Sequence, residues 1–177
     1  APTPVFGARR QRRIPVRIGS VAFVTHQKEQ NMTTTKATAV WHGTLREGNG
    51  TMSLPSGTYE GPFSFRSRFE KGAGRATGTN PEELLAAAHA GCFSMALSGQ
   101  LTAAGFPPEA IDTTAAVTMT TGEGGAKITT SHLVTKARVP GIDEATFREK
   151  VDAAAKGCPV SKALAGLEIS VEATLEG

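Results

Sequence analysis

Cysteine is scarce in this sequence, and long apolar runs are absent. Two cysteines in 177 residues are too few for a disulfide-rich secreted scaffold. No uninterrupted apolar run approaches the roughly 18 residues needed to cross a bilayer, so the sequence predicts no transmembrane helix and no membrane partner. What remains has the length of one ordinary domain, and its 39% of hydrophobic residues are enough for a core.

Positive charge is confined to the start of the chain. Residues 1–35 hold six Lys and Arg against one Glu, a net charge of +5. Residues 36–177 hold 13 Lys and Arg against 15 Asp and Glu, a net charge of −2. This slightly acidic part gives no electrostatic reason to expect a nucleic-acid partner.

The composition therefore predicts a basic N-terminal extension over residues 1–35 and one domain over 36–177. Residues 1–31 combine prolines, an arginine cluster and a short apolar stretch. Three interpretations stay open for them: an arm without a catalytic role, a transit peptide, or an arm that contacts nucleic acid or membrane.

Strand patterns dominate the start of the domain. Residues 36–45 and 51–54 predict a hairpin, joined by a turn that contains Arg46. Residues 63–70 alternate apolar and polar side chains, which predicts a third strand. Its apolar face would carry three phenylalanines and its opposite face two arginines: Phe63, Phe65, Phe69, Arg66 and Arg68.

The clearest helix start follows a glycine-rich loop over 71–79, which we interpret as a solvent loop. Asn80 is a suitable N-cap, Pro81 suits the first helical position, and Glu82 suits the positive end of the helix dipole. The helix should end near Ala104. Because small residues fill it, we expect it to be buried on most sides.

The second half predicts a further hairpin and two more helices. Thr- and Val-rich segments at 112–121 and 126–139 flank a Gly-rich turn. A helix capped by Asp143 should run to about Lys156, a short helix should follow Cys158, and a last strand should cover 168–174. The order lacks regular βαβ alternation, so the predicted fold class is α+β.

The two cysteines are the strongest chemical signal. Cys92 lies in the middle of the long predicted helix, whereas Cys158 lies at the start of a short one, where free amides favour a thiolate. Spacing alone leaves open a paired thiol function and two small core residues. The rarity of cysteine suits a cytoplasmic chain without structural disulfides.

His89 lies one helical turn before Cys92. Three interpretations of it remain: a hydrogen-bonded core histidine, a zinc ligand with Cys92 and Cys158, or the base of a Cys–His pair. Arg68 and Glu82 suggest an ion pair, which is either a surface contact or a device that lowers a thiol pKa.

Taken together, several segments resemble the OsmC/Ohr family across most of residues 36–177. They are Arg68-Phe69-Glu70, Gly78-Thr79-Asn80-Pro81-Glu82-Glu83-Leu84-Leu85, Ala88-His89-Ala90-Gly91-Cys92-Phe93-Ser94-Met95, Val139-Pro140-Gly141-Ile142-Asp143 and Gly157-Cys158-Pro159-Val160-Ser161. The residues around Cys92 are more similar to those of the osmotically inducible branch than to those of the Ohr branch.

The resemblance implies an α+β fold with antiparallel strands packed on a long central buried helix, in an intertwined homodimer with active sites at the interface. It implies a peroxidase that reduces organic hydroperoxides, with Cys92 as the peroxidatic thiol and Cys158 as the resolving thiol. Arg68 and Glu82 match the residues that hold the reactive sulfur, with Arg46 as the second candidate for the arginine. No metal or other cofactor is implied, and a dithiol such as a lipoyl group is the expected reductant.

Two other functions remain open at this stage. One is a non-enzymatic dimer that binds small molecules or lipids and senses redox state through its cysteines. The other is a cysteine-dependent hydrolase, for which the sequence offers no Asn or Asp placed to orient His89. Local reasoning also makes Cys158 the better thiolate, so an exchange of the two cysteine roles stays open.

Overall fold

A computed structural model describes residues 32–70 and 77–176. The predicted arm at 1–31 and part of the predicted loop, residues 71–76, lie outside the described residues. The chain divides into two units, residues 1–35 and 36–177. The described residues of the first unit, 32–35, are neither helix nor strand, and the rest of the description concerns the second unit.

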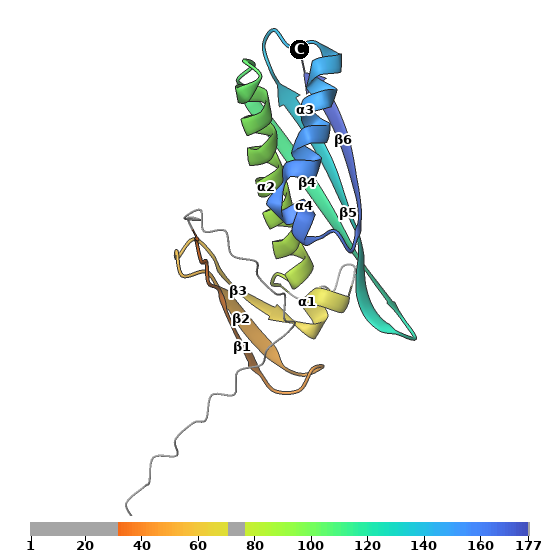
Figure 1. The fold of residues 1–177 in the computed structure, drawn as a ribbon. Coiled ribbons are helices and arrows are strands. Elements are labelled where there is room, and N and C mark those ends of the chain that lie inside the picture. The colour runs from red at the N-terminus through yellow and green to blue at the C-terminus, as the bar shows by residue number, and fades with distance from the viewer. Residues whose placement is uncertain (1–31, 71–76, 177) are drawn as a thin grey trace, which may run out of the picture. The chain divides into compact units, whose positions relative to one another are not determined.

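The second unit begins with a small antiparallel sheet in the order β1-β2-β3 (Figure 1). Its strands are β1 (Thr38–His42), β2 (Asn49–Ser53) and β3 (Glu60–Ser64), which confirms the first predicted hairpin. Gly50 on β2 pairs with Trp41 on one side and Phe63 on the other. A side chain at Gly50 would collide with the Phe63 ring, so glycine allows the two rings to pack with centroids 5.2 Å apart.

The strand predicted over 63–70 is wrong beyond Ser64. Residues Phe65–Phe69 form the short helix α1, because Ser64 and Ser67 make a reciprocal capping box around its first turn. The two phenylalanines suit both patterns, since residues four apart also share a helix face. Their ring centroids lie 4.8 Å apart. Arg68 is consequently not opposite the phenylalanines, and its guanidinium lies 5.2 Å from the centre of the Phe69 ring.

The long helix α2 (Pro81–Ala103) has the predicted start. The Asn80 side chain accepts a hydrogen bond from the Glu83 amide at 2.8 Å, and Pro81 occupies the first turn. The backbone leaves the helix at Gly105, where φ is +89°. That angle lies in the left-handed region that glycine adopts at little cost.

The expectation that α2 is buried on most sides is wrong for this chain. Its buried residues from the second turn onward are four apart, and they form one stripe: His89, Phe93, Leu97 and Leu101. The remaining sides carry mostly small residues, and Met95 among them is 78% exposed. By length and composition alone, α2 is also apolar enough to cross a membrane. The absence of a long uninterrupted apolar run therefore does not exclude a helix of this kind.

The second sheet has the order β4-β5-β6. Its strands are β4 (Ala110–Gly122), β5 (Gly125–Arg138) and β6 (Glu168–Glu176). The β4–β5 pair is the second predicted hairpin. The expected antiparallel arrangement fails at β6, which pairs in parallel with β5, because two helices carry the chain back before β6 begins.

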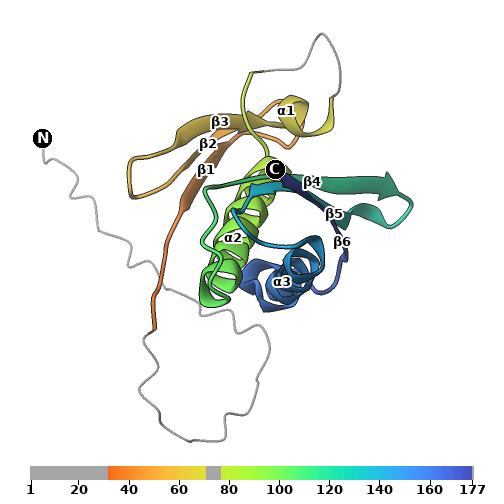
Figure 2. The same ribbon diagram turned by 90° about the horizontal axis from the view of Figure 1, so that it is seen from above.

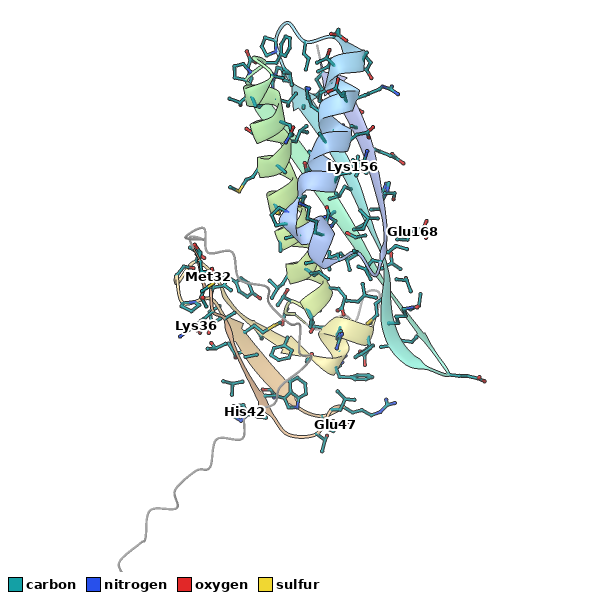
Figure 3. The ribbon with its side chains drawn as sticks, in the orientation of Figure 1. Met32, Lys36, His42, Glu47, Lys156 and Glu168 are labelled. Atoms are coloured by element: carbon teal, nitrogen blue, oxygen red, sulfur yellow. The ribbon has the colours of Figure 1, made fainter. Side chains whose placement is uncertain are left out.

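Those helices are α3 (Glu144–Gly157) and α4 (Pro159–Ala163). Asp143 caps α3 by accepting from the Thr146 amide at 2.9 Å, and Lys156 lies in its last turn, where a cation suits the dipole (Figure 3). Helices α2 and α3 lie side by side over one face of the β4–β6 sheet (Figures 1 and 2). They enclose the hydrophobic core, whose largest members are Phe93, Phe147, Leu97, Leu101 and Leu133.

Candidate active site

The two cysteines meet at the centre of the second unit. The Sγ atoms of Cys92 and Cys158 are 3.2 Å apart, and both are free thiols. Cys92 lies mid-way along α2, and Cys158 caps the start of α4. Cys92 is partly exposed, whereas Cys158 has no exposed surface. The fold therefore pairs a solvent-accessible thiol with a buried one.

The surroundings of the two sulfurs shift their thiol pKa values in opposite directions. Burial raises the pKa of the Cys92 thiol, the neighbouring Cys158 raises it further, and the Val160 amide offsets only part of this. Burial also raises the pKa of Cys158, but hydrogen bonds from the Ser161 amide, the Ser161 hydroxyl and Cys92 outweigh it and leave that pKa below its ordinary value. Within one chain, Cys158 is therefore the more acidic thiol, as its place at a helix start suggested.

His89 is a hydrogen-bonded core histidine. Its Nδ1 lies 2.7 Å from Ser131 Oγ on β5 and its Nε2 lies 2.9 Å from Ser161 Oγ on α4, and the ring is fully buried. Both nitrogens are occupied, so neither is available as a zinc ligand or as a base for Cys92. No group of three metal-binding side chains occurs within 32–70 and 77–176. The two serines were missed, although Ser131 falls on the inward face of an alternating strand.

Arg68 and Glu82 form the ion pair that the sequence suggested. Arg68 Nη2 donates to Glu82 Oε1 at 2.6 Å, and Arg68 Nε lies 3.1 and 3.2 Å from the two carboxylate oxygens. The Glu82 side chain is only 10% exposed, against 35% for Arg68. A fork of this kind fixes the plane of the guanidinium and leaves its outer edge open.

The ion pair is held in place by the segments that carry its two partners. On α1, the Ser67 hydroxyl donates to the Thr79 carbonyl at 2.8 Å, just before α2 begins. Thr79 in turn donates to Glu83 Oε2 at 2.7 Å. These bonds tie α1 to the start of α2, so that Arg68 faces the first turn where Glu82 lies.

An apolar cavity of about 280 Å³ adjoins Arg68. Aromatic rings supply much of its wall, together with Pro81 and Leu45; they are Trp41, Phe63, Phe65 and Phe69. These rings are half-buried and do not belong to the hydrophobic core. Arg46, the second candidate arginine, lies 5.0 Å from the centre of the Phe65 ring, whereas the contact with Glu82 is made by Arg68.

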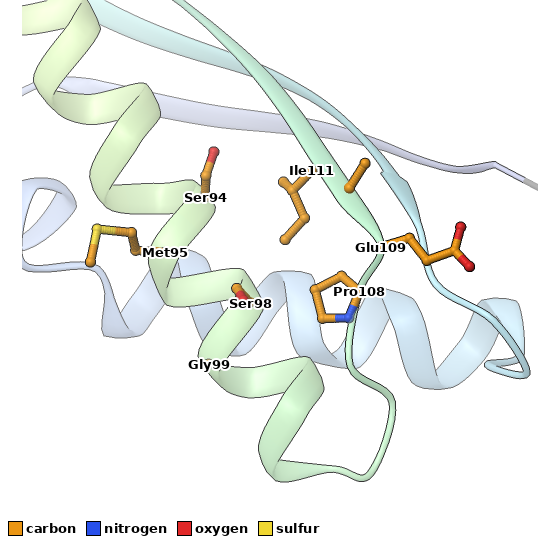
Figure 4. Close-up of a pocket in the computed structure, with 8 residues that line it drawn as sticks. Ser94, Met95, Ser98, Gly99, Pro108, Glu109 and Ile111 are labelled. Carbon is orange, nitrogen blue, oxygen red and sulfur yellow. The ribbon is translucent and has the colours of Figure 1, made fainter.

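The ion pair and the thiol pair are separate within one chain. Glu82 and Cys92 are ten residues apart on α2, which corresponds to about 15 Å along the helix axis. A second, open depression of about 550 Å³ lies beside the other half of α2, between Ser94 and Ile111 (Figure 4). Neither this depression nor the cavity beside Arg68 is lined by a cysteine.

Known proteins are similar to this chain both in sequence and in fold. The sequence pattern of OsmC-like proteins matches residues 72–173, more than half of the chain. The chain belongs to the OsmC family. It is 48% identical to peroxiredoxin OsmC of Escherichia coli over 130 residues. The aligned part covers 73% of this chain and 88% of that protein. The peroxiredoxin OsmC of Shigella flexneri matches to the same extent.

Solved structures of the OsmC/Ohr fold agree with this assignment. The organic hydroperoxide resistance protein OhrB of Bacillus subtilis superposes with a TM-score of 0.60 at 28% identity, over 80% of this chain and 98% of that chain. An organic hydroperoxide resistance protein of Elizabethkingia anophelis, with thiocyanate bound, gives 0.61 at 25% identity, over 82% and 98% of the two chains. The α+β architecture expected from the resemblance is thereby confirmed.

Membership in the OsmC family settles the class of chemistry. At 48% identity to a peroxiredoxin, the chain is a cysteine-based peroxidase, an oxidoreductase of the defence against oxidative stress. Such an enzyme works through thiol sulfur and needs no prosthetic group. The ring nitrogens of His89, the candidate base of a cysteine hydrolase, bond Ser131 and Ser161, which does not favour that alternative.

Proposed function

We propose that the enzyme reduces organic hydroperoxides to alcohols with Cys92 as the peroxidatic thiol and Cys158 as the resolving thiol. The observation that carries the proposal is the 3.2 Å separation of their sulfurs, two free thiols 66 residues apart in sequence. At that distance a small shift joins them covalently. The difference in exposure assigns the roles, because a peroxide reaches the partly exposed Cys92 and not the buried Cys158.

The proposed cycle balances without a cofactor. The Cys92 thiolate attacks the distal oxygen of the hydroperoxide, the O–O bond breaks, and the alkoxide takes up a proton and leaves as the alcohol. Cys92 is left as a sulfenic acid. The Cys158 thiolate attacks its sulfur, the S–O bond breaks, and hydroxide leaves as water after protonation. An external dithiol such as a lipoyl group then reduces the disulfide to two thiols.

We further propose that the enzyme is a homodimer in which Arg68 of one chain serves Cys92 of the other. Within one chain the two lie about 15 Å apart along α2, and Cys92 has a raised pKa that makes it a poor nucleophile. The exposed small residues of α2, such as Ala88 and Gly91, allow close approach of a second copy, and the exposed Met95 offers it an apolar contact. A guanidinium beside Cys92 would lower the thiol pKa.

The cavity next to Arg68 supports the proposal that the substrate is apolar. Its walls are largely aromatic, and Arg68 is the charged group at its edge. In this proposal the apolar part of the hydroperoxide packs against the rings while Arg68 donates to the peroxide oxygens. The paired free thiols also suit the cytoplasm, where they are reduced between turnovers, and we propose that the enzyme acts there.

The decisive experiment is dithiol-dependent consumption of cumene hydroperoxide by wild type and Cys92→Ser, with hydrogen peroxide as the comparison substrate. We expect faster reduction of the organic peroxide, loss of activity in the variant, and a Cys92–Cys158 disulfide in a non-reduced peptide digest. Equal or faster reduction of hydrogen peroxide contradicts the apolar site. A stable sulfenic acid on Cys92 beside a free Cys158 contradicts the resolving role.

The shared active site has a test of its own, by mixing the inactive Cys92→Ser variant with the slow Arg68→Met variant. Cys92→Ser keeps Arg68, and Arg68→Met keeps Cys92, so a mixed dimer contains one complete site if the arginine comes from the second chain. Refolding the two variants together should then restore activity above that of either alone. If both groups of a site belong to one chain, the mixture is no faster than Arg68→Met alone.

A further inference from the structure

The buried His89 links the two sulfurs to the sheet through a row of polar groups. Ser131 on β5, His89 on α2 and Ser161 on α4 are joined by contacts of 2.7 and 2.9 Å. The Ser161 amide also contacts Cys158 Sγ at 3.5 Å. All three side chains of this row are buried, with at most 8% exposed surface. The proposed cycle assigns none of them a role.

The direction of the hydrogen bonds follows from burial. Burial lowers the pKa of His89, so the ring is neutral at pH 7 and carries one N–H. Within the described residues, Ser131 Oγ has His89 Nδ1 as its hydrogen-bond partner. A buried hydroxyl with one partner donates its proton, because an unsatisfied donor costs more than an unused lone pair. Nδ1 is then the acceptor, and the ring proton lies on Nε2.

This tautomer determines what Ser161 does. Nε2–H donates to Ser161 Oγ at 2.9 Å, so the hydroxyl proton of Ser161 points elsewhere. Ser161 is the third residue of α4, and Cys158 is its N-cap. The Ser161 amide donates to Cys158 Sγ at 3.5 Å, so Ser161 lies directly beside the sulfur, which can accept a hydrogen bond from its hydroxyl. The lowered pKa of Cys158, to which this hydroxyl contributes, agrees with that direction.

We propose that Ser131, His89 and Ser161 form a hydrogen-bond relay that aims the Ser161 hydroxyl at Cys158 Sγ and stabilises the thiolate form of that sulfur. His89 is a positioning residue: it contacts neither sulfur and acts through Ser161. The inference rests on the resolving role proposed for Cys158. Once Cys92 is a sulfenic acid, the stabilised thiolate attacks its sulfur, the S–S bond forms, the S–O bond breaks and hydroxide leaves as water.

The first test reads the tautomer directly in the full-length, reduced enzyme. Long-range ¹H–¹⁵N NMR of the histidine rings distinguishes a protonated nitrogen from an unprotonated one. We expect His89 to carry its proton on Nε2, with Nδ1 unprotonated at neutral pH. A proton on Nδ1, or on both nitrogens, overturns the relay.

The second test measures the thiol that the relay serves. In a Cys92→Ala background Cys158 is the one remaining thiol, and its pKa is read from the pH dependence of thiolate absorbance without any peroxide. Adding Ser161→Ala should raise that pKa by about one unit, which reduces the thiolate fraction about tenfold below the pKa. Ser131→Ala should raise it less, because the ring then loses its fixed tautomer but Ser161 keeps its hydroxyl.

Ser94→Ala is the matched control, because Ser94 also lies on α2 and bonds Ala90 O and Thr113 Oγ1 instead. It should leave the Cys158 pKa unchanged. An unchanged pKa in Ser161→Ala, or an equal rise in Ser94→Ala, overturns the relay. Because no turnover is measured, this result is independent of whether wild type reduces hydroperoxides or forms the Cys92–Cys158 disulfide.

Discussion

Residues 81–176, which carry the two sulfurs, are packed as a domain core, whereas residues 38–69, which carry Arg68, are not. All members of the hydrophobic core cluster lie between Phe93 and Cys158. The first region instead has half-buried rings around a cavity, and a few hydrogen bonds join it to the start of α2. The comparison teaches that the geometry of the two sulfurs is fixed by the packed core of one chain, while Arg68 lies in a loosely packed region outside that core.

The largest difference between the two regions should appear in stability. Phe93 has no exposed surface and belongs to the core, so Phe93→Ala should lower the free energy of unfolding by about 3–5 kcal/mol. Phe63 is half-buried beside the cavity, so Phe63→Ala should cost only about 1 kcal/mol. Urea unfolding of both variants measures this. Equal losses would show that residues 38–69 are as tightly packed as the core.

The next effect concerns catalysis. Arg68→Met should slow reduction of cumene hydroperoxide about 100-fold, equivalent to about 2.7 kcal/mol of barrier, and should raise the pKa of Cys92. Arg68→Lys should keep part of the charge effect but lose the paired hydrogen bonds. The pH dependence of Cys92 alkylation provides the measurement, with Arg46→Met as control. If Arg46→Met is the slow variant instead, the arginine role belongs to the β1–β2 turn.

A smaller effect is the pH dependence that the packed region should show. Because burial lowers the pKa of His89, the unfolded chain binds a proton there that the folded chain does not. This contribution to stability is present above the ordinary histidine pKa of about 6.5 and is lost as the pH falls below it. Between pH 7 and 5.5 the free energy of unfolding should fall by about 1 kcal/mol from this residue.

Unfolding of His89→Asn over the same pH range isolates that contribution. The variant should show a correspondingly smaller fall. Identical pH profiles for wild type and His89→Asn would mean that the folded protein protonates this ring.

The smallest expected effect comes from the first unit. Removing residues 1–31 should leave turnover and dimerisation largely unchanged, because the resemblance to the family begins near residue 36. Size-exclusion chromatography and the cumene hydroperoxide assay check this on the truncated chain. A monomeric or inactive product would assign the arm a structural role.

Local signals in the sequence were enough to predict most elements. The start of α2 was predicted because Asn80 and Pro81 each have a specific backbone role there, and the β4–β5 hairpin because its two strands flank a Gly-rich turn. The failure at Phe65–Phe69 has a physical cause. Phenylalanines at alternate positions fit a strand, two of them four apart also fit a helix turn, and the choice depends on a serine capping box.

The site was less predictable because it joins distant segments. Nothing local indicates that residues 66 apart bring their sulfurs to 3.2 Å, and the resemblance supplied that pairing. The contacts of His89 with Ser131 and Ser161 depend on how α2, β5 and α4 pack together. The one-sided burial of α2 did have a signal, since Phe93, Leu97 and Leu101 continue the spacing of four residues that begins at His89.

The closeness of the two sulfurs affects the free energy that is needed to reduce a disulfide between them. A bond between them would close a loop of 66 residues across α2, β4, β5 and α3. In the unfolded chain such a closure costs about 4 kcal/mol of entropy, which the folded chain has already overcome. The same free energy therefore makes the disulfide harder to reduce in the folded protein, by about 90 mV for a two-electron couple. A dithiol whose oxidation closes a small ring reduces such a disulfide better than two separate monothiols do, because its oxidation costs far less entropy.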